Sequence, residues 1–376
     1  MRSLAFLSLF LSLQNASSTK SAIPPLTIDE LKLSSFAMVM AHDAASGYLS
    51  THFGIKNEIY DWTKTQTFPT LKNARDLLEC GGRAFDWRPK LTKDNKLIAH
   101  HGDVNIDHDF KDSIAEFTSF LSDNPDEFAV LTVWDCETES GAASTCDAEV
   151  SSQLSDLKLI PVTSCDDLLH ITVGEAKKLG QLETGGSLLV VTGAGGPGGA
   201  SCSTGNYDSA IACWGETRRR ATSNDTDTDT DTDTDTDTDT DTDTDVEIFG
   251  AYSCWDSKDS KNTPLAQMDA YLDTVGGQSS FSTPFNEMQC IWQETTDSVV
   301  IGELHLSSLV EDEEKSKLNK RLTQFVKDGR FENLNLVMVN NVCDGGLALK
   351  AALDEFNAKK IKMNLFYFTK LAAFKS

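Results

Sequence analysis

The chain has 376 residues, of which 58 are acidic and 33 are basic, so its formal net charge is −25 at pH 7. An alternating Asp-Thr tract from Asp225 to Asp245 carries 11 of the acidic residues and leaves −14 for the rest of the chain. An acidic body argues against nucleic acid as a partner and against adhesion to anionic membranes through bulk charge. Any contact with lipid must therefore be local and apolar.

The amino terminus has the features of a secretory signal peptide. Arg2 precedes an apolar run from Leu4 to Leu13, and small residues follow around Ala16 and Ala22. The run is too short to cross a bilayer, so we predict that residues 1–22 are removed. The mature protein would then be secreted or extracellular and have no transmembrane segment. The alternative is a buried first helix.

The remaining residues, 23–376, are enough for one large α/β barrel or for two ordinary domains. We predict a single barrel domain, interrupted at about 216–246 by a low-complexity insertion that contains the Asp-Thr tract. This composition cannot bury apolar surface and should be disordered. We expect the protein to be a monomer.

The first predicted strand, Phe36 to Ala41, ends in the polar pair His42-Asp43. A loop from Ala44 to Thr67 follows. The next predicted element is a helix from Thr70 to Cys80, whose apolar residues recur on one face and which Gly81-Gly82 would end.

The stretch from Gly81 to Gly102 says most about chemistry. It predicts a strand from Arg83 to Arg88, a polar turn, and a second strand from Leu97 to His100 that ends in His101. An acid, a guanidinium and two imidazoles lie among its apolar positions, and packing alone does not require them. By the strand period of two, Asp86 shares a face with Arg88, whereas His100 points away from His101 and should be structural.

Beyond this stretch, predicted strands alternate with helices, which argues for parallel β/α units. The predicted helices are 110–121, 315–326 and 347–356; the predicted strands are 129–134, 187–192, 246–252, 290–293, 299–302 and 334–339, and 363–368 is a further apolar segment. Polar residues that follow the carboxyl ends of successive strands converge on one site in a (β/α) barrel. The sequence therefore predicts an α/β fold with an irregular TIM-type barrel.

Nine cysteines favour an exported protein, because disulfides persist in oxidising compartments. Cys136 with Cys146, and Cys202 with Cys213, are close pairs that we predict to be bonded. The connectivity of the other cysteines is not deducible, and one must stay free or pair between chains. The spacing of cysteines and histidines does not suggest a zinc site.

The motifs of the first part of the chain form an ordered series. They are His42-Asp43, Phe85-Asp86-Trp87-Arg88, His100-His101-Gly102, Phe120-Leu121 and Asn124-Pro125-Asp126-Glu127. Each motif alone is weak, but their order and spacing together resemble the X-domain of phosphatidylinositol-specific phospholipase C, particularly the bacterial type. The resemblance is dense from about Ala37 to Val133 and thin beyond it.

The resemblance implies a phosphodiesterase that cleaves phosphatidylinositol, or a glycosylated form of it, at a membrane surface. In this family the inositol 2-hydroxyl attacks the adjacent phosphorus. His42 matches the general base, His101 the general acid, Asp43 the acid that orients His101, and Arg88 the arginine that binds the phosphate.

Arg88 also bears on the metal question. The calcium-dependent, animal-type enzymes carry a second carboxylate on the matching strand, which helps to hold the ion, whereas this chain has a guanidinium there. We therefore predict no metal and no cofactor, with Asp86 in a supporting role.

One position departs from the bacterial pattern. Bacterial members keep a late aspartate that holds the general base in the right tautomer, and the nearest matching strand end here is Asn340. Its amide can accept the imidazole N–H but adds no charge, and Asp344 could replace it. Trp134 stands where the family has a lysine, which leaves the inositol contacts unassigned. Two alternatives stay open: a headgroup-binding barrel with weakened catalysis, and a metal-dependent glycerophosphodiester or sphingomyelin phosphodiesterase.

Overall fold

In a computed structural model of the chain, the described residues are 27–49, 64–102, 104–164, 166–192, 203–205, 264–281, 283–292 and 309–374. Predictions for residues 1–22, for the insertion at 216–246, for the strands at 246–252 and 299–302, and for a bond between Cys202 and Cys213 lie outside these ranges.

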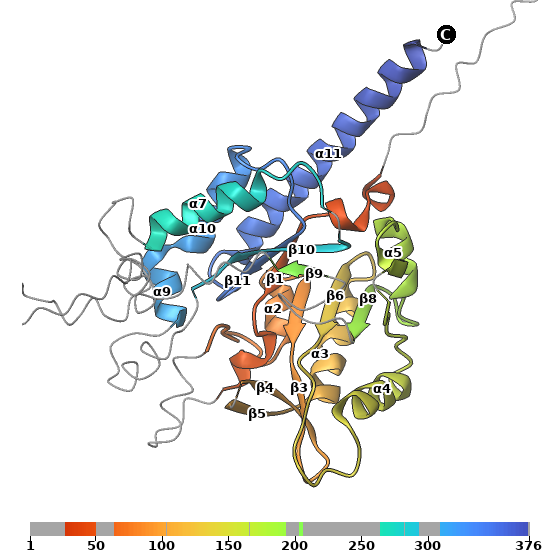
Figure 1. Ribbon diagram of the computed structural model, residues 1–376, viewed down its shortest axis with the longest axis vertical. Helices are drawn as coiled ribbons and strands as arrows, with labels where there is room; N and C mark the ends of the chain where they lie inside the picture. The colour runs from red at the N-terminus through yellow and green to blue at the C-terminus, as the bar shows by residue number, and fades with distance from the viewer. Residues whose placement is uncertain are drawn as a thin grey trace, which may run out of the picture.

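Seven parallel strands form one sheet in the order β8-β6-β2-β1-β11-β10-β9 (Figure 1). The strands are β1 (Met38–Ala41), β2 (Ala84–Trp87), β6 (Phe128–Val133), β8 (Ser187–Thr192), β9 (Ser203–Gly205), β10 (Phe285–Cys290) and β11 (Leu336–Val339). Except for β8 and β9, each strand of this sheet lies beside the next one along the chain, and β11 returns to β1, with Met38 opposite Leu336. This winding order is that of a (β/α) barrel. Within the described part of the chain, β8 and β9 are the two ends of the sheet and do not pair with each other.

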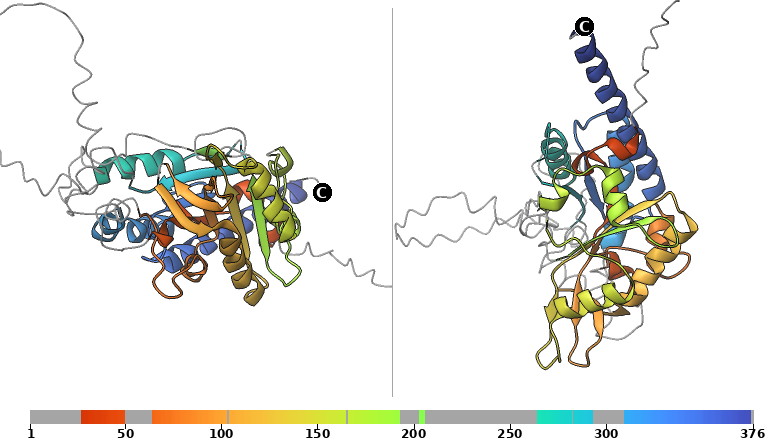
Figure 2. Two further views of the ribbon diagram at one scale, coloured as in Figure 1. Left: turned by 90° about the horizontal axis from the view of Figure 1, so that it is seen from below. Right: turned by 90° about the vertical axis from the view of Figure 1, so that its right-hand side faces the viewer.

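A smaller sheet is inserted after β2, with the strand order β5-β4-β3-β7. Its strands are β3 (Pro89–Leu91), β4 (Leu97–His101), β5 (Val104–Asp109) and β7 (Glu137–Thr138). The predicted strand at 97–100 therefore exists, but it belongs to this sheet and not to the barrel, because the short turn after β3 permits only antiparallel pairing. Figures 1 and 2 show the β3–β4 hairpin at the end of the molecule away from the C-terminus.

The helices follow the barrel strands along the chain. They are α2 (Arg75–Glu79), α3 (Phe110–Asp123), α4 (Cys146–Asp156), α5 (Val173–Leu179), α7 (Pro264–Gly276), α9 (Leu309–Ser316), α10 (Leu318–Lys327) and α11 (Gly346–Phe374). Short 3₁₀ turns are η1 (Ile28–Glu30), η2 (Leu33–Ser35), η3 (Ala44–Tyr48) and η4 (Asp166–Leu168). Figure 1 shows the C-terminal part of α11 extending away from the rest of the molecule. In the described part of the chain, no helix combines the length and apolarity that crossing a bilayer requires.

Successive residues of the central strands face two different hydrophobic cores. Met38 and Met40 of β1 lie in the inner core with Met338 of β11, whereas Val39 and Val337 lie in the outer core that packs on the helices. This alternation is the period of two of a β-strand. The polar residues that follow these strands in register, above all His42 and Asn340, therefore continue the inward-facing rows.

Two predicted helices differ from the structure. The helix expected from Thr70 begins only at Arg75, because the Asp76 carboxylate accepts hydrogen bonds from the backbone N–H groups of residues 70, 71 and 72 and holds them in a turn. The helix expected at 315–326 is divided into α9 and α10 at Lys317, whose φ of 55° is left-handed.

Other boundaries shift by smaller amounts. The prediction of a strand at 187–192 is confirmed as β8, and the helix at 110–121 is confirmed and extends to Asp123. The strand expected at 290–293 is wrong in position, because β10 ends at Cys290. The apolar segment 363–368 continues α11 and is not a separate element.

Two disulfides join described cysteines. The predicted bond between Cys136 and Cys146 is confirmed, and a second bond, between Cys80 and Cys343, was not foreseen. The second bond links the end of α2 to the turn between β11 and α11 across 263 residues of sequence. Cys290 is a free, buried thiol.

Candidate active site

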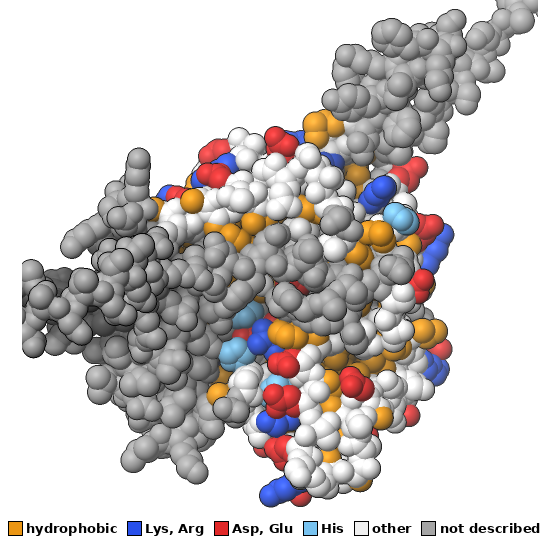
Figure 3. Space-filling model, in the orientation of Figure 1, with side chains coloured by type: hydrophobic (Ala, Val, Ile, Leu, Met, Phe, Trp, Pro, Cys, Tyr) orange, Lys and Arg blue, Asp and Glu red, His pale blue; other side chains and the backbone are white. Residues whose placement is uncertain are grey.

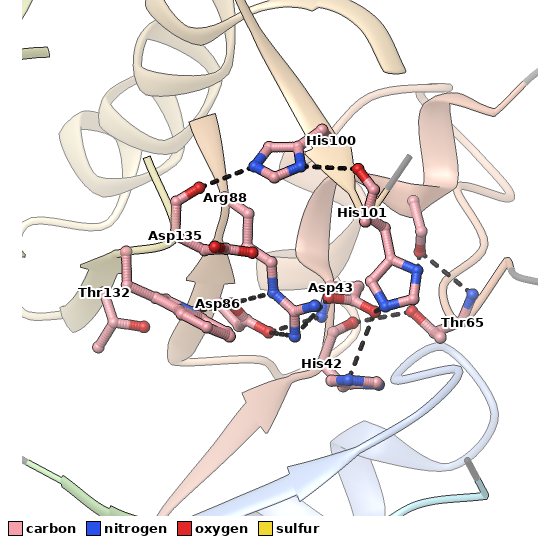
Figure 4. Close-up of polar contacts among 12 residues, drawn as sticks. His42, Asp43, Thr65, Asp86, Arg88, His100, His101, Thr132 and Asp135 are labelled. Atoms are coloured by element: carbon pink, nitrogen blue, oxygen red, sulfur yellow. Dashed lines mark hydrogen bonds and ion pairs between the residues drawn. The ribbon is translucent and has the colours of Figure 1, made fainter. Parts of the chain in front are cut away.

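All six predicted site residues converge at the carboxyl end of the barrel strands. Figure 4 labels five of them, namely His42, Asp43, Asp86, Arg88 and His101. Most follow barrel strands: His42-Asp43 after β1, Asp86 and Arg88 at the end of β2, and Asn340 after β11. His101 comes instead from the last residue of β4 in the small sheet. The β3–β4 hairpin thus folds back to bring an imidazole over the end of the barrel. Figure 3 shows histidine, basic and acidic side chains near the middle of one face of the molecule, at the border of residues that are not described.

Asp43 is the centre of this group. Its Oδ2 atom lies 3.3 Å from Nε2 of His42 and 3.3 Å from Nε2 of His101, and its Oδ1 atom lies 2.7 Å from Nη2 of Arg88. The side chain is only 3% exposed, and burial alone would raise its pKa. The charges of Arg88, His101 and His42 more than offset this and hold the pKa well below its usual range. Asp43 is therefore ionised at neutral pH.

Arg88 bridges the two carboxylates of the site. Its Nη2 atom lies 2.8 Å from Oδ2 of Asp86 as well as 2.7 Å from Asp43. Burial would lower the pKa of Arg88, but the charges of Asp43 and Asp86 raise it above its ordinary value. Trp134 covers the guanidinium at 4.4 Å from its ring centroid, and the Trp134 indole N–H donates to Asp86. Trp134, which we matched to a lysine of the family, thus packs on Arg88 and keeps it in place.

The same geometry bears on metal binding. Among the residues that the structure describes, one group has side-chain atoms close enough to share a metal ion, namely His42, Asp43 and Asp86. Nη2 of Arg88 already lies within hydrogen-bonding distance of both carboxylates, so a fixed positive charge takes the place that a cation would need. This donor set does not fit a metal ion while the guanidinium stays between the carboxylates.

The formal charges of the site balance when one histidine is protonated. Two carboxylates, Asp43 and Asp86, and one guanidinium leave a single negative charge, and both imidazoles contact the same Asp43 oxygen. One imidazolium beside one neutral imidazole makes the group neutral. A general acid and a general base require this combination of charge states.

Asn340 sets the tautomer of His42. Its Oδ1 atom lies 3.0 Å from Nδ1 of His42, and its Nδ2 group donates to the carbonyl of Trp292 at 2.9 Å. Because the amide N–H₂ is used by that carbonyl, Oδ1 faces the imidazole and Nδ1 donates to it. In the neutral ring, Nε2 is then the proton acceptor. Asp344 does not replace Asn340, since its carboxylate pairs with Lys320 at 3.1 Å.

A buried polar loop supports His42 from behind, and no motif in the sequence pointed to it. The Thr65 hydroxyl and the Gln66 amide both donate to the His42 carbonyl at 2.9 Å, and Gln66 also reaches the carbonyl of Val339 at 3.0 Å. Ser46 lies 2.8 Å from the Thr65 hydroxyl. A Thr-Gln pair in a loop has no periodicity that would reveal these contacts.

Left-handed residues recur where the chain leaves the strands. Asp43, Asp135 and Asn341 each follow a barrel strand by two positions and have φ values of 43°, 52° and 43°. Asp and Asn tolerate this region better than other residues that have a Cβ. An Asp or Asn two positions beyond a predicted strand is thus a sequence signal that would have marked these turns.

His100 lies beside the site but does not contact Asp43. Its ring is buried, with Nδ1 at 3.1 Å from the Gly102 carbonyl oxygen and Nε2 at 2.8 Å from the Asp135 carbonyl oxygen (Figure 4). Its backbone N–H donates to the Arg88 carbonyl at 2.9 Å. The prediction that His100 points away from His101 thus agrees with its contacts.

Comparison with solved structures identifies the fold. No family model matches the sequence. Two variants of the phosphatidylinositol-specific phospholipase C from Staphylococcus aureus align with TM-scores of 0.51 and 0.50, at 14% and 15% sequence identity. Both alignments cover 86% of this chain, and they cover 93% and 94% of the bacterial chains. The enzyme from Listeria monocytogenes aligns at a TM-score of 0.48 and 13% identity, over 87% of this chain and 94% of its own.

These alignments extend far beyond the motifs of the first third of the chain, and they agree with the winding order of the sheet. They confirm the predicted α/β class and the resemblance on which the TIM-type barrel was expected. The chain has the fold of the bacterial phosphatidylinositol-specific phospholipases C.

Proposed function

We propose that the protein is a phosphodiesterase that cleaves phosphatidylinositol, or a glycosylated form of it, without a metal ion. The observation that carries the proposal is the contact of two imidazoles, His42 and His101, with one buried carboxylate that also pairs with Arg88. This arrangement provides a base, an acid and a fixed positive charge within one small volume. The fold similarity to bacterial enzymes named for this reaction supports the same substrate class.

In the first step, Nε2 of neutral His42 accepts the proton of the inositol 2-hydroxyl as its oxygen attacks the phosphorus. The nucleophile and the phosphorus belong to the same molecule, so little entropy is lost in bringing them together. Negative charge grows on the non-bridging oxygens, where Arg88 stabilises it. Its two ion pairs use Nη2 and a longer hydrogen bond to Asp86 uses Nε, so the N–H donors on Nη1 are the ones that would bind phosphate.

In the second part of the reaction, the bond from phosphorus to the glycerol oxygen breaks and His101 gives that oxygen a proton. Asp43 stabilises the imidazolium of His101 before the transfer, since the two lie 3.3 Å apart. The products are diacylglycerol and a cyclic inositol phosphate. The proton taken by His42 balances the proton lost by His101.

The wider setting of this activity is part of the proposal. Residues 23–376 would form one secreted, monomeric domain that meets a phospholipid headgroup at a membrane surface. The two disulfides support an oxidising compartment.

A substrate panel tests the proposal. Purified protein in EDTA is given vesicles of phosphatidylinositol, vesicles of sphingomyelin, and soluble glycerophosphodiesters, and headgroup release is measured. We expect release from phosphatidylinositol alone, and its loss in His42→Ala and in His101→Ala. His170→Ala, which changes an exposed histidine outside the site, should keep full activity. Turnover of the other substrates only after a divalent cation is added would contradict the proposal.

A further inference from the structure

Both ring nitrogens of His100 face backbone carbonyl oxygens. Nδ1 lies 3.1 Å from the oxygen of Gly102, and Nε2 lies 2.8 Å from the oxygen of Asp135. A carbonyl oxygen only accepts hydrogen bonds, and a neutral imidazole has a single N–H. Turning the ring by a half-rotation would put carbon atoms in both places and lose both contacts. The imidazolium satisfies both carbonyls at once.

We propose that His100 is held in its doubly protonated form and acts as a positioning residue for the site. One N–H group ties down the turn that follows His101, and the other ties down the turn that follows Trp134. The proposed effect on catalysis rests on the proposed function, whereas the charge state of His100 does not.

The position of His100 makes it a junction between three parts of the site. Its neighbour in sequence, His101, contacts Asp43, while Asp135 follows Trp134, which covers Arg88. Its own backbone N–H is bonded to the Arg88 carbonyl. The two hydrogen bonds of the His100 ring thus connect the turn after His101, the proposed acid, to the turn after Trp134, which covers the phosphate-binding Arg88.

Both turns that the His100 ring contacts have left-handed backbone conformations. Gly102 has a φ of 51° and Asp135 has a φ of 52°. Glycine adopts this region freely, but for Asp135 it is less favourable than the right-handed region, so the turn benefits from a contact that favours it. A charged N–H donor makes a stronger hydrogen bond than a neutral one and suits this task.

The buried imidazolium also has nearby negative charge. Oε2 of Glu137 lies 3.9 Å from Nδ1 of His100, and Glu137 is itself paired with Lys90 at 3.0 Å. The titratable and charged groups on the elements around the ring are Glu137 of β7, Lys90 of β3, Arg88 and Asp135 at the ends of β2 and β6, and His101 of β4. Glu137 and Asp135 are the carboxylates of this set, and Lys90 and Arg88 are its cations.

If the His100 ring lost one proton, one of its two nitrogens would change from a hydrogen-bond donor to an acceptor, and its lone pair would face a carbonyl oxygen. A buried acceptor facing another acceptor is unfavourable, so one of the two turns would be released. Release of the Gly102 turn would move His101 relative to Asp43. Activity should therefore fall on the alkaline side of the pH profile through a group that never contacts the substrate.

The charge state is measured directly by NMR. The full-length protein, labelled with ¹⁵N in histidine, is recorded at neutral pH by long-range ¹H–¹⁵N correlation. The His100 signals are identified by their loss in His100→Gln, and exposed His170 provides a reference. We expect both ring nitrogens of His100 to carry a proton. A single protonated nitrogen would overturn the proposal whether or not the protein cleaves phosphatidylinositol.

Two variants test the positioning role. His100→Phe keeps a ring but has no donor, and we expect kcat to fall about tenfold or more with little change in KM. His100→Gln keeps amide donors that do not titrate, so it should recover part of kcat and lose one ionisation from the alkaline limb. An unchanged alkaline limb in His100→Gln would contradict the role even if His100→Phe fails to fold.

Discussion

Asp43 determines the charge balance of the site because, among the residues that the structure describes, it contacts both imidazoles and the guanidinium. A buried anion with three cationic or protonatable neighbours stays ionised, so the protons of the site reside on the histidines. The residue itself adopts a left-handed conformation, which aims its carboxylate back over the end of β1. The position of the Asp43 carboxylate thus depends on one left-handed turn.

Arg88 offers the first test at this scale. In Arg88→Lys the charge stays but the planar fork is lost, so one ammonium group must serve two carboxylates and the phosphate. We expect kcat for phosphatidylinositol to fall about 100-fold, which is typical for the loss of one positioned charge donor. The measurement is turnover of vesicles in EDTA.

The matched control for this variant is Arg75→Lys. Arg75 also pairs with two carboxylates, those of Glu79 and Asp123, but lies on the surface at α2. It should retain the wild-type rate. Full activity of Arg88→Lys, or recovery of its rate on addition of Ca²⁺, would speak against a guanidinium that acts in place of a metal.

Asn340 gives a second prediction, which concerns pH. Asn340→Asp puts a negative charge 3.0 Å from Nδ1 of His42 and favours the protonated ring. We expect the acid limb of the kcat/KM profile to move to higher pH, because His42 must lose a proton before it acts as a base. Asn340→Leu, which cannot accept the Nδ1 proton, should lower kcat/KM at every pH. An acid limb that does not move in Asn340→Asp would exclude His42 as the base.

For single residues, the sequence predicted which side chains lie together in the candidate site, but not the contacts that hold them in place. His42, Asp43, Asp86, Arg88 and His101 could be predicted because they lie in short motifs that end predicted strands. The contacts of Trp134 and of the 65–66 pair could not, since they depend on loops whose path is set by tertiary packing. His100 was predicted to be structural, and the geometry of its ring adds a charge state that a strand period cannot reveal.

At the scale of elements, α11 is attached to the barrel through a buried lysine. Nζ of Lys360 donates to the Ser35 carbonyl at 3.2 Å and to the Asn333 side chain, and it lies 4.8 Å from the Phe356 ring centroid. Burial lowers the pKa of Lys360 to about 8. The contact fixes the first half of a 29-residue helix against η2 and the segment that precedes β11.

This pKa predicts how stability depends on pH. The folded state releases the Lys360 proton near pH 8, whereas the unfolded chain keeps it to its ordinary value of 10.5. Across this window the unfolded state binds more protons, so the contribution of Lys360 to stability rises with pH. Relative to Lys360→Met, the wild-type free energy of unfolding should increase by on the order of 2 kcal/mol from about pH 8 to about pH 10.

Urea unfolding at a series of pH values measures this difference. Lys350→Met, on an exposed pair of the same helix with Asp354, is the control and should show no such pH-dependent gain. A wild-type advantage that stays constant across the series would show that Lys360 does not release its proton in this range.

Helices and strands were predicted correctly where the apolar periodicity was strong. Their boundaries were missed where a single residue determines where a helix begins or breaks. β8 and α3 follow from runs of apolar residues that match one period. The start of α2 depends on the three hydrogen bonds of Asp76, and the break between α9 and α10 depends on one left-handed residue. β4 was predicted as a strand, but its place in a second sheet was not. That place is set by the short turn that pairs it with β3, and not by the residues of β4 itself.

At the scale of the whole molecule, the sheet joins the start of the chain to its end. β1 pairs with β11, and the disulfide between Cys80 and Cys343 ties the same regions covalently across 263 residues. The winding order could be expected from the alternation of strands and helices, and this bond could not, because its partners are remote in sequence.

The length of the enclosed loop predicts the effect of this disulfide. Replacing Cys80 and Cys343 by Ser should lower the free energy of unfolding by about 5 kcal/mol, because a long loop loses much entropy on closure. The Cys136–Cys146 disulfide closes a loop of only 10 residues. The matched double variant that replaces these two cysteines should lower the free energy of unfolding by about 3 kcal/mol. Urea unfolding of both variants gives the comparison, and a larger loss at the shorter loop would contradict it.

In the proposed reaction, two histidines that contact one carboxylate, together with a guanidinium in place of a cation, transfer a phosphoryl group within the inositol headgroup. The most direct test is ³¹P NMR of phosphatidylinositol vesicles mixed with the full-length protein in excess EDTA. We predict that the first phosphorus product is the cyclic inositol phosphate and that added Ca²⁺ leaves its rate unchanged. A linear phosphomonoester as the first product, or the absence of any product until Ca²⁺ is added, would contradict the account.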